Sequence, residues 1–254
     1  MEVQDMVKPI CKYSTLIKNV ENLNYELEKC IHIANNGRKG PTLIEIPDDI
    51  SRMEMPKRIT HFKKKKIKIS KKINTKKIKE LFAKSNKPLV VIGNGCLAGT
   101  AILDIKKFLK KNKIPYALSW AALHSFPSND LFNFGSFGVA ATRYGNFAIQ
   151  KADLILFLGV RLSGQLTGTN TLTFSPNSKK IVVDIDKEEF TSQRLPKIDL
   201  KFNYDVNEFI KTLNKIKFNS NAIKIKKWVD EIGELKKNYP VSVSYTHLGA
   251  HETR

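Results

Sequence analysis

A glycine-rich turn is the first feature of this sequence that could do chemistry. Gly93, Gly95 and Gly99 follow an apolar run at residues 88 to 92 and precede a predicted helix from about residue 100 to 111. At this place a Rossmann-type domain brings backbone N–H groups close to a pyrophosphate. The spacing departs by one residue from the dinucleotide fingerprint. The glycines therefore predict either a phosphate-binding loop or a tight strand-to-helix turn, and both interpretations stay open.

A nicotinamide site would also need an acidic residue after the second strand, to bind the ribose hydroxyls. The second predicted strand, residues 115 to 119, ends in Leu118-Ser119-Trp120, so we predict no NAD site. We expect Trp120 to be an interior aromatic residue. Arg161 directly follows another apolar run, and its planar guanidinium suits a phosphate.

The runs that precede these residues indicate the fold. Apolar, strand-like segments alternate with amphipathic helical segments, and they cover Pro88 to Ile92, Pro115 to Ser119, Asp153 to Leu158 and Lys180 to Ile185. Such alternation is typical of a parallel sheet that helices cover on both faces. The sequence predicts an α/β fold, with a doubly wound, Rossmann-like domain over residues 76 to 216.

The first part of the chain has a different organisation. A helix is predicted from Asn22 to Asn36, and a short β-branched strand from Thr42 to Ile46 ends at Pro47. An isolated helix and strand cannot cover their own apolar faces or strand edges. We therefore interpret residues 1 to 56 as a truncated α/β domain remnant.

The net charge of +20 is concentrated in one basic stretch of the chain. No Asp or Glu occurs from Lys57 to Lys79. Such a stretch repels itself and buries little apolar area, so we predict a basic linker at residues 57 to 75. Arginine is scarce and only Phe62 interleaves with the lysines, so we expect no nucleic-acid partner.

The remaining features place the chain in a broad class. The longest apolar runs, such as Leu154 to Val160, are far shorter than the roughly 20 residues of a membrane span, so we expect no membrane partner and a cytoplasmic location. The three cysteines have no metal-like spacing. Residues 217 to 242 are predicted to be a linker. Residues 243 to 254 lack any periodicity, and we interpret them as a non-native tail resembling a translated vector junction.

Several segments together resemble one enzyme family. They are Met6 to Tyr13 (MVKPICKY), Gly37 to Asp49 (GRKGPTLIEIPDD), Lys151 to Arg161 (KADLILFLGVR) and Val183 to Asp186 (VDID). In order and spacing they are similar to the large subunits of acetolactate synthases, which are thiamine-diphosphate-dependent. The resemblance makes residues 1 to 56 the end of a pyrimidine-binding domain, and residues 76 to 216 the central domain.

The resemblance implies a parent enzyme that uses thiamine diphosphate and Mg²⁺ on a 2-keto acid, as a homo-oligomer (dimer or tetramer). In such enzymes a glutamate early in the pyrimidine domain drives ylid formation, and a Gly-Asp-Gly segment of a third domain anchors the metal and diphosphate. No Gly-Asp-Gly occurs here, and no position corresponds to the glutamate. We therefore predict no catalytic residue and no metal ligand in this chain, and no activity by itself.

Acetolactate synthases also bind FAD in the central domain, in a structural role. By resemblance, the residues that would line this pocket are Gly93, Gly95, Arg161, Asp184 and Ile185. The segment Leu162 to Gln165 (LSGQ) replaces the Phe-Asp-Asp-Arg of the family, which removes two acids and an arginine. FAD binding therefore stays open. An alternative to the enzyme fragment is a stand-alone Rossmann-like module that binds a nucleotide or serves assembly without catalysis.

Overall fold

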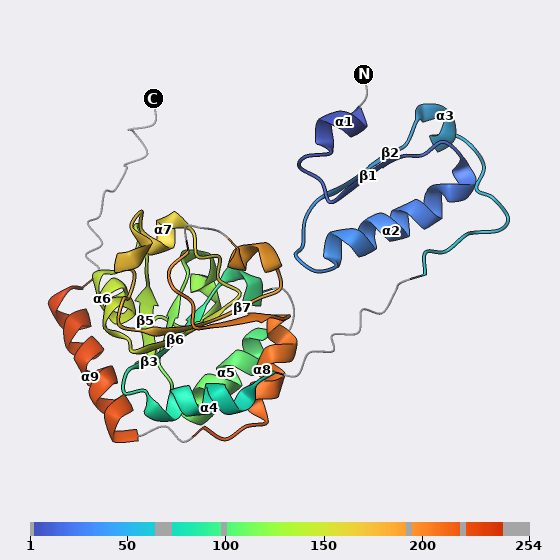
Figure 1. Cartoon of the computed structure of the whole chain (residues 1–254). Helices are drawn as coiled ribbons and strands as arrows, with labels where there is room; N and C mark the ends of the chain where they lie inside the picture. The colour runs from blue at the N-terminus through green and yellow to red at the C-terminus, as the bar shows by residue number, and fades with distance from the viewer. Residues whose placement is uncertain (1–2, 64–72, 98–100, 192–194, 219–221, 241–254) are drawn as a thin grey trace, which may run out of the picture. The chain divides into compact units, whose positions relative to one another are not determined.

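The computed structural model describes residues 3 to 63, 73 to 97, 101 to 191, 195 to 218 and 222 to 240. The chain divides into two compact units, Met1–Lys72 and Ile73–Arg254, which we treat separately as the first and the second unit (Figure 1). The predicted tail at residues 243 to 254 lies outside the described residues. So do residues 64 to 72 of the predicted basic linker.

A six-stranded parallel sheet forms the centre of the second unit, in the order β5-β4-β3-β6-β7-β8. The strands are β3 (Pro88–Ile92), β4 (Tyr116–Leu118), β5 (Asn133–Ser136), β6 (Leu154–Leu158), β7 (Lys179–Asp184) and β8 (Leu200–Asn203). From β3 the chain first adds strands on one side and then, beginning with β6, on the other. The order therefore reverses between β3 and β6, which is the topological switch point of a doubly wound sheet. The predicted fold class is confirmed.

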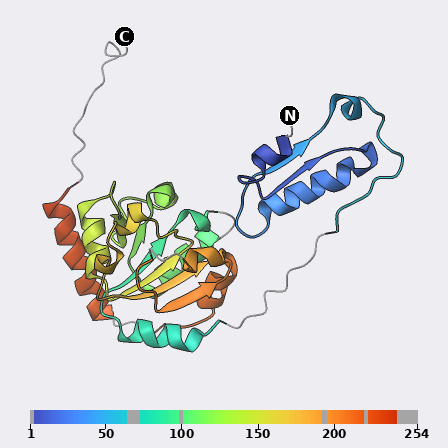
Figure 2. The same ribbon diagram turned by 45° about the horizontal axis from the view of Figure 1, so that its top comes forward.

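Helices cover both faces of this sheet, as Figures 1 and 2 show. One face packs against α4 (Thr75–Lys84), α5 (Ala101–Asn112) and α8 (Val206–Asn214), and the other against α6 (Arg143–Lys151) and α9 (Ala222–Asn238). Side chains alternate between the two faces along each strand. In β3, Val90 and Ile92 enter the first core and Leu89 and Val91 the second. Burial on both sides explains why the central strands β3 and β6 are unbroken apolar runs in the sequence.

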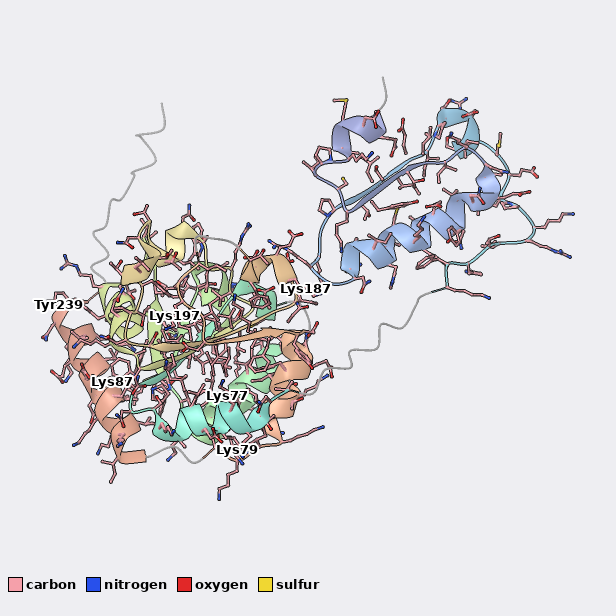
Figure 3. The ribbon with its side chains drawn as sticks, in the orientation of Figure 1. Lys77, Lys79, Lys87, Lys187, Lys197 and Tyr239 are labelled. Carbon is pink, nitrogen blue, oxygen red and sulfur yellow. The ribbon has the colours of Figure 1, made fainter. Side chains whose placement is uncertain are left out.

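The helix α9 lies within the segment predicted as a linker, residues 217 to 242. Its Trp228 is 1% exposed and donates a hydrogen bond from Nε1 to the Pro88 carbonyl at 3.2 Å. Glu231 binds Lys87 at 2.7 Å and Lys151 at 2.8 Å, and Figure 3 shows Lys87 beside this helix. This part of the predicted linker therefore belongs to the packed core of the second unit. The sequence is helix-like from Trp228 to Lys237, but the basic residues around its apolar positions hid the packing of this helix on the sheet.

The first unit contains two parallel strands, β1 (Tyr13–Leu16) and β2 (Thr42–Glu45), joined through α2 (Leu23–Asn35). Two short helices, α1 (Val3–Val7) and α3 (Asp48–Ser51), flank them. No residue of β1 or β2 is fully buried. This unit therefore has a much smaller apolar core than the second one.

A lysine joins the two sequence motifs of the first unit. The Lys12 ammonium donates hydrogen bonds to the carbonyls of Ile33, Asn36 and Arg38, at 2.6, 2.6 and 2.8 Å. The first two carbonyls lie at the C-terminal end of α2, where a cation is favoured by the helix dipole, and that of Arg38 lies just beyond it. A Cβ atom at Gly40 would lie 2.9 Å from Lys12 Cδ, so the glycine leaves room for the lysine stem.

Candidate functional site

The loops that follow β3 and β6 meet at the switch point. Gly93 N–H donates to the Leu158 carbonyl at 2.9 Å, and Gly95 N–H donates to the Gly159 carbonyl at 3.0 Å. Gly159 N–H in turn donates to the Val183 carbonyl of β7 at 3.0 Å. These bonds extend the sheet pairing past the strand ends. They place the loops of three adjacent strands side by side at the carboxyl edge of the sheet.

This close approach needs glycine. A Cβ atom at Gly93 would lie 2.1 Å from the Gly159 carbonyl oxygen, and one at Gly95 would lie 3.0 Å from Gly159 Cα. Gly159 itself has a φ of +55°, a left-handed conformation that glycine adopts at little cost. The glycines thus have a packing reason that requires no ligand. The interpretation as a tight turn gains direct support.

The amides of this turn are largely occupied inside the protein. Besides those of Gly93 and Gly95, the N–H of Cys96 donates to the Gly93 carbonyl at 3.1 Å and that of Leu97 to the Asn94 carbonyl at 3.0 Å, within the short helix η2 (Asn94–Cys96). A phosphate cradled by these amides would have to displace bonds that already exist. The role of Gly93 and Gly95 in phosphate binding stays a prediction.

Arg161 lies beyond the end of β6. Its side chain is 69% exposed, and its Nε lies 3.3 Å from Oε1 of Glu189, which is 14% exposed. Glu189 belongs to η5 (Lys187–Phe190), the short helix after β7. The guanidinium is thus accessible to solvent and anchored at one nitrogen. A phosphate or another planar anion could reach it.

Asp184 is the last residue of β7, and Ile185 begins the turn that follows. Asp184 Oδ1 accepts a hydrogen bond from Asp186 N–H at 2.9 Å, and the side chain of Ile185 is 38% exposed. Asn203 donates from Nδ2 to the carbonyls of Asp184 and Ile185, at 3.2 and 2.8 Å. The turn is therefore held in place by the neighbouring strand β8.

All the predicted pocket residues lie at the end of β7 or after β3, β6 or β7, at the same edge of the sheet. The structure brings the loops of these strands together, and ligand binding by these residues stays a prediction. Glu189 was missed from the sequence. Its only signal was an acidic pair, Glu188-Glu189, shortly after the VDID segment. The presence of two adjacent acids in the sequence does not indicate that Glu189 contacts Arg161.

The expectation for Trp120 was wrong. This residue begins the short helix η3 (Trp120–Ser125) directly after β4, and its side chain is 59% exposed. Apolar β4 ends at Leu118, so the chain leaves the core before it reaches the tryptophan. An exposed aromatic side chain therefore stands at the carboxyl edge of the sheet.

Cys96 is no nucleophile at this edge. Burial raises the pKa of its thiol to about 12, and Sγ donates to the Leu158 carbonyl at 3.0 Å. A thiol that stays protonated reacts slowly, because the thiolate is the reactive form. We therefore assign Cys96 a packing role in the turn.

The described residues offer no anchor for a divalent metal. Among them, no three His, Cys, Asp or Glu side chains come together in a group that could hold an ion. Nor is any helix in the described part of the chain long and apolar enough to cross a membrane. Thiamine diphosphate bound through Mg²⁺ does not fit these residues by themselves.

Comparison with known proteins decides the family. Residues 75–213 match the family described as "Thiamine pyrophosphate enzyme, central domain", which is more than half of the chain. The chain belongs to this family. In this thiamine pyrophosphate enzyme central domain the match runs from α4 to the last turn of α8. The first unit and α9 lie outside it.

Curated relatives extend the similarity to most of the chain. It is 27% identical to acetolactate synthase 1, chloroplastic, of Nicotiana tabacum over 250 residues, which cover 94% of this chain and 37% of the relative. It is 26% identical to acetolactate synthase, chloroplastic, of Arabidopsis thaliana, with 94% and 36% covered. The thiamine pyrophosphate enzyme central domain and its flanks thus span a little over a third of the length of these relatives.

Proposed function

We propose that this chain is part of a thiamine-diphosphate-dependent enzyme that acts on 2-keto acids by carboligation or decarboxylation. The observation that carries the proposal is the central-domain match over residues 75–213. The alignment with acetolactate synthases supports it, because it also includes sequence outside that domain. The parent enzyme is proposed to be a cytoplasmic homo-oligomer, a dimer or a tetramer.

The domain assignment is part of this proposal. Residues 1 to 56 are the end of a pyrimidine-binding domain, and the central domain spans residues 76 to 216. Residues 57 to 75 link the two. Residues 217 to 242, which include α9, lead toward a pyrophosphate-binding domain.

The chain by itself supplies a scaffold for this chemistry. When bound, thiamine diphosphate stabilises the carbanion that forms from a 2-keto acid. The sequence contains no Gly-Asp-Gly anchor, and the described residues contain no metal-binding group. The second unit contains the six-stranded sheet and the loops at its switch point. We assign no proton-transfer step to any of its residues.

Activity measurements on two polypeptides test the proposal. With thiamine diphosphate and Mg²⁺, this chain is expected to leave pyruvate and other 2-keto acids unconsumed. The second polypeptide is translated from the genomic region that includes this sequence and its flanks, here called the extended locus. It should consume at least one 2-keto acid, and its sequence should add a glutamate-bearing half-domain and a Gly-Asp-Gly segment. Turnover by the present chain would contradict the assignment. So would an extended protein that contains both segments and consumes no 2-keto acid.

A nucleotide at the switch point is the second part of the proposal, with FAD as the ligand and a structural role. Arg161 fits a phosphate because its guanidinium is exposed. Gly93 and Gly95 would lie along the phosphates of the ligand in this proposal. Asp184 and Ile185 would lie beside the adenosine. Since the turn amides are occupied, Arg161 is the main phosphate ligand in this proposal.

Flavin fluorescence tests this part. Titration of FAD with the chain should quench the fluorescence, and Arg161→Ala should weaken binding by about one to two orders of magnitude, because a charge-assisted contact is lost. Unchanged binding by the variant would remove Arg161 from the site. Absence of binding to folded protein would leave the glycines as turn residues.

The stand-alone module remains the alternative, and one observation favours it. With α9 in place, helices cover both faces of the six-stranded sheet, so the second unit has a core of its own. A module of this kind would bind the nucleotide without any adjacent thiamine-diphosphate segments. The extended locus distinguishes the two, because only the enzyme requires those segments.

A further inference from the structure

The ion pair between Arg161 and Glu189 joins the loops of two neighbouring strands. Leu158 at the end of β6 is the register partner of Val183 in β7. Arg161 lies three residues after Leu158, and Glu189 lies six residues after Val183. The pair is asymmetric. The arginine is 69% exposed and the glutamate only 14%.

The pair contributes little to stability. Solvent screens an ion pair with one exposed partner, and holding a long side chain in place costs entropy. The contact instead holds the Arg161 guanidinium at its Nε atom. Nη1 and Nη2 form the other edge of the planar fork, which is the edge that binds a phosphate through two parallel hydrogen bonds.

The helix η5 that carries Glu189 is held through the residues on either side of it. Asp186 caps η5 by accepting from Glu188 N–H at 3.0 Å, and Thr191 Oγ1 donates to the Glu188 carbonyl at 2.9 Å. Lys201 of β8 donates from Nζ to the Phe190 carbonyl at 3.0 Å. The carboxylate therefore stands on an ordered helix rather than on a loose loop.

Other acids of this edge do not take the same role. In the part of the chain that the structure describes, Glu189 is the one acidic group that pairs with Arg161. Asp184 Oδ1 and Asp186 Oδ1 both accept backbone N–H groups of their own turn. Ser163 and Gly164 stand where the resembled family has its two acids, and the acidic partner of Arg161 lies on η5, after the next strand β7.

We propose that Glu189 is a positioning residue, which holds Arg161 at Nε so that its remaining fork receives the phosphate of a nucleotide. The inference rests on the proposed nucleotide site and adds the residue that prepares it. Glu189 does not touch the ligand. Because it already holds the Arg161 side chain in place, Arg161 loses less conformational entropy when the ligand binds.

Calorimetric titration of the whole chain with FAD, and separately with ADP, tests the proposal. Glu189→Gln should weaken binding by about five- to tenfold, less than the loss of Arg161 itself. Glu188→Gln is the matched control, because it removes the same charge from an exposed neighbour on η5. It should leave the dissociation constant unchanged.

A double-mutant cycle separates positioning from a general structural effect. In an Arg161→Ala background, Glu189→Gln should no longer change the affinity, because its effect passes through the arginine. Glu189→Asp should restore part of the binding. Urea unfolding midpoints should agree among the variants. Equal losses in both backgrounds, or tighter binding by Glu189→Gln, would overturn the proposal.

Two failures can be told apart. If the unaltered chain binds neither FAD nor ADP at about 100 µM, the nucleotide site itself is wrong and the role of Glu189 falls with it. If the chain binds and Arg161→Ala weakens the complex while Glu189→Gln does not, only the positioning role is refuted.

Discussion

The two units of this chain use parallel strands in opposite ways. In the second unit, every residue of β3 and β6 is buried. In the first unit, no residue of β1 or β2 is. A sheet covered by helices on both faces has two apolar cores, whereas a two-stranded sheet with one main helix has little apolar area to bury.

Polar contacts compensate for this in the first unit. Lys12 binds three carbonyls at the end of α2, and Tyr13 OH donates to Glu26 at 2.7 Å while accepting from Lys29 at 2.6 Å. Glu28 accepts from Phe62 N–H at 2.8 Å. The comparison teaches that apolar truncations should be costly in the second unit, and that loss of single polar contacts should be moderate in the first.

Trp228→Ala should have the largest effect. We expect it to lower the free energy of unfolding by about 3 to 5 kcal/mol, because a fully buried ring that packs at 5.4 Å on Phe134 is lost. Urea unfolding measures it. Trp120→Ala is the control, since Trp120 is 59% exposed, and it should change stability by less than about 0.5 kcal/mol.

The same two variants report which tryptophan is buried. The chain has two tryptophans, so each variant leaves a single emitter. Trp120→Ala should retain the blue-shifted emission of a buried indole, and Trp228→Ala should not. Equal stability of the two variants would show that α9 does not pack on the sheet.

Gly93→Ala is expected to be next in size. The added Cβ would meet the Gly159 carbonyl oxygen at 2.1 Å, so backbone must move, at a cost of about 1 to 3 kcal/mol or more. Gly164→Ala is the matched control, because nothing lies within 4 Å of its Cβ position. Thermal unfolding of the pair checks this. If Gly93→Ala were as stable as the control, the close approach at the switch point would be refuted.

Lys12→Met tests the polar clamp of the first unit. It keeps most of the aliphatic stem and removes the ammonium, so α2 should lose about 1 kcal/mol at its C-terminal end. Hydrogen exchange should become faster in the last turn of α2. Lys18→Met removes an exposed lysine and should change nothing. Equal exchange rates in both variants would mean that the clamp does not stabilise the helix.

Acidification should have the smallest effect of these changes on stability. It should release the segment Thr60 to Phe62, which is hydrogen-bonded to α2. The hydrogen bond with His61, and next that from Phe62 N–H, lowers the pKa of Glu28 below its ordinary value of 4.5. A depressed carboxyl pKa gives stabilisation that is complete above 4.5 and is lost as the pH falls through the folded-state pKa. The segment Thr60 to Phe62 should therefore stay docked at neutral pH and detach in acid.

Amide chemical shifts of Phe62 follow this release. They should titrate with a midpoint below 4.5 and should lose that transition in Glu28→Gln. A midpoint above 4.5 would reverse the sign of the effect. The first unit would then gain nothing from this carboxylate.

Local patterns predicted the architecture of the second unit well. Val90, Leu156 and Ile181 lie in unbroken apolar runs, and such runs report burial on both faces wherever the strands come to lie. The strand order was not predicted, and neither were the edge strands β5 and β8, which are not unbroken apolar runs in the sequence. The same patterns did not show that α9 packs on the sheet, because lysines flank the buried Trp228. They also misplaced Trp120, which lies just beyond the end of its strand.

For the candidate site, the sequence by itself determined that glycines and an arginine follow apolar strands, because residue types and their spacing are local properties. Only the tertiary structure decided their partners. Gly93 meets Gly159, Arg161 meets Glu189 and Lys12 reaches past Gly40 to the end of α2. Parallel strands are joined by long crossovers, so residues far apart in the chain become neighbours at one sheet edge, and no local pattern records that contact.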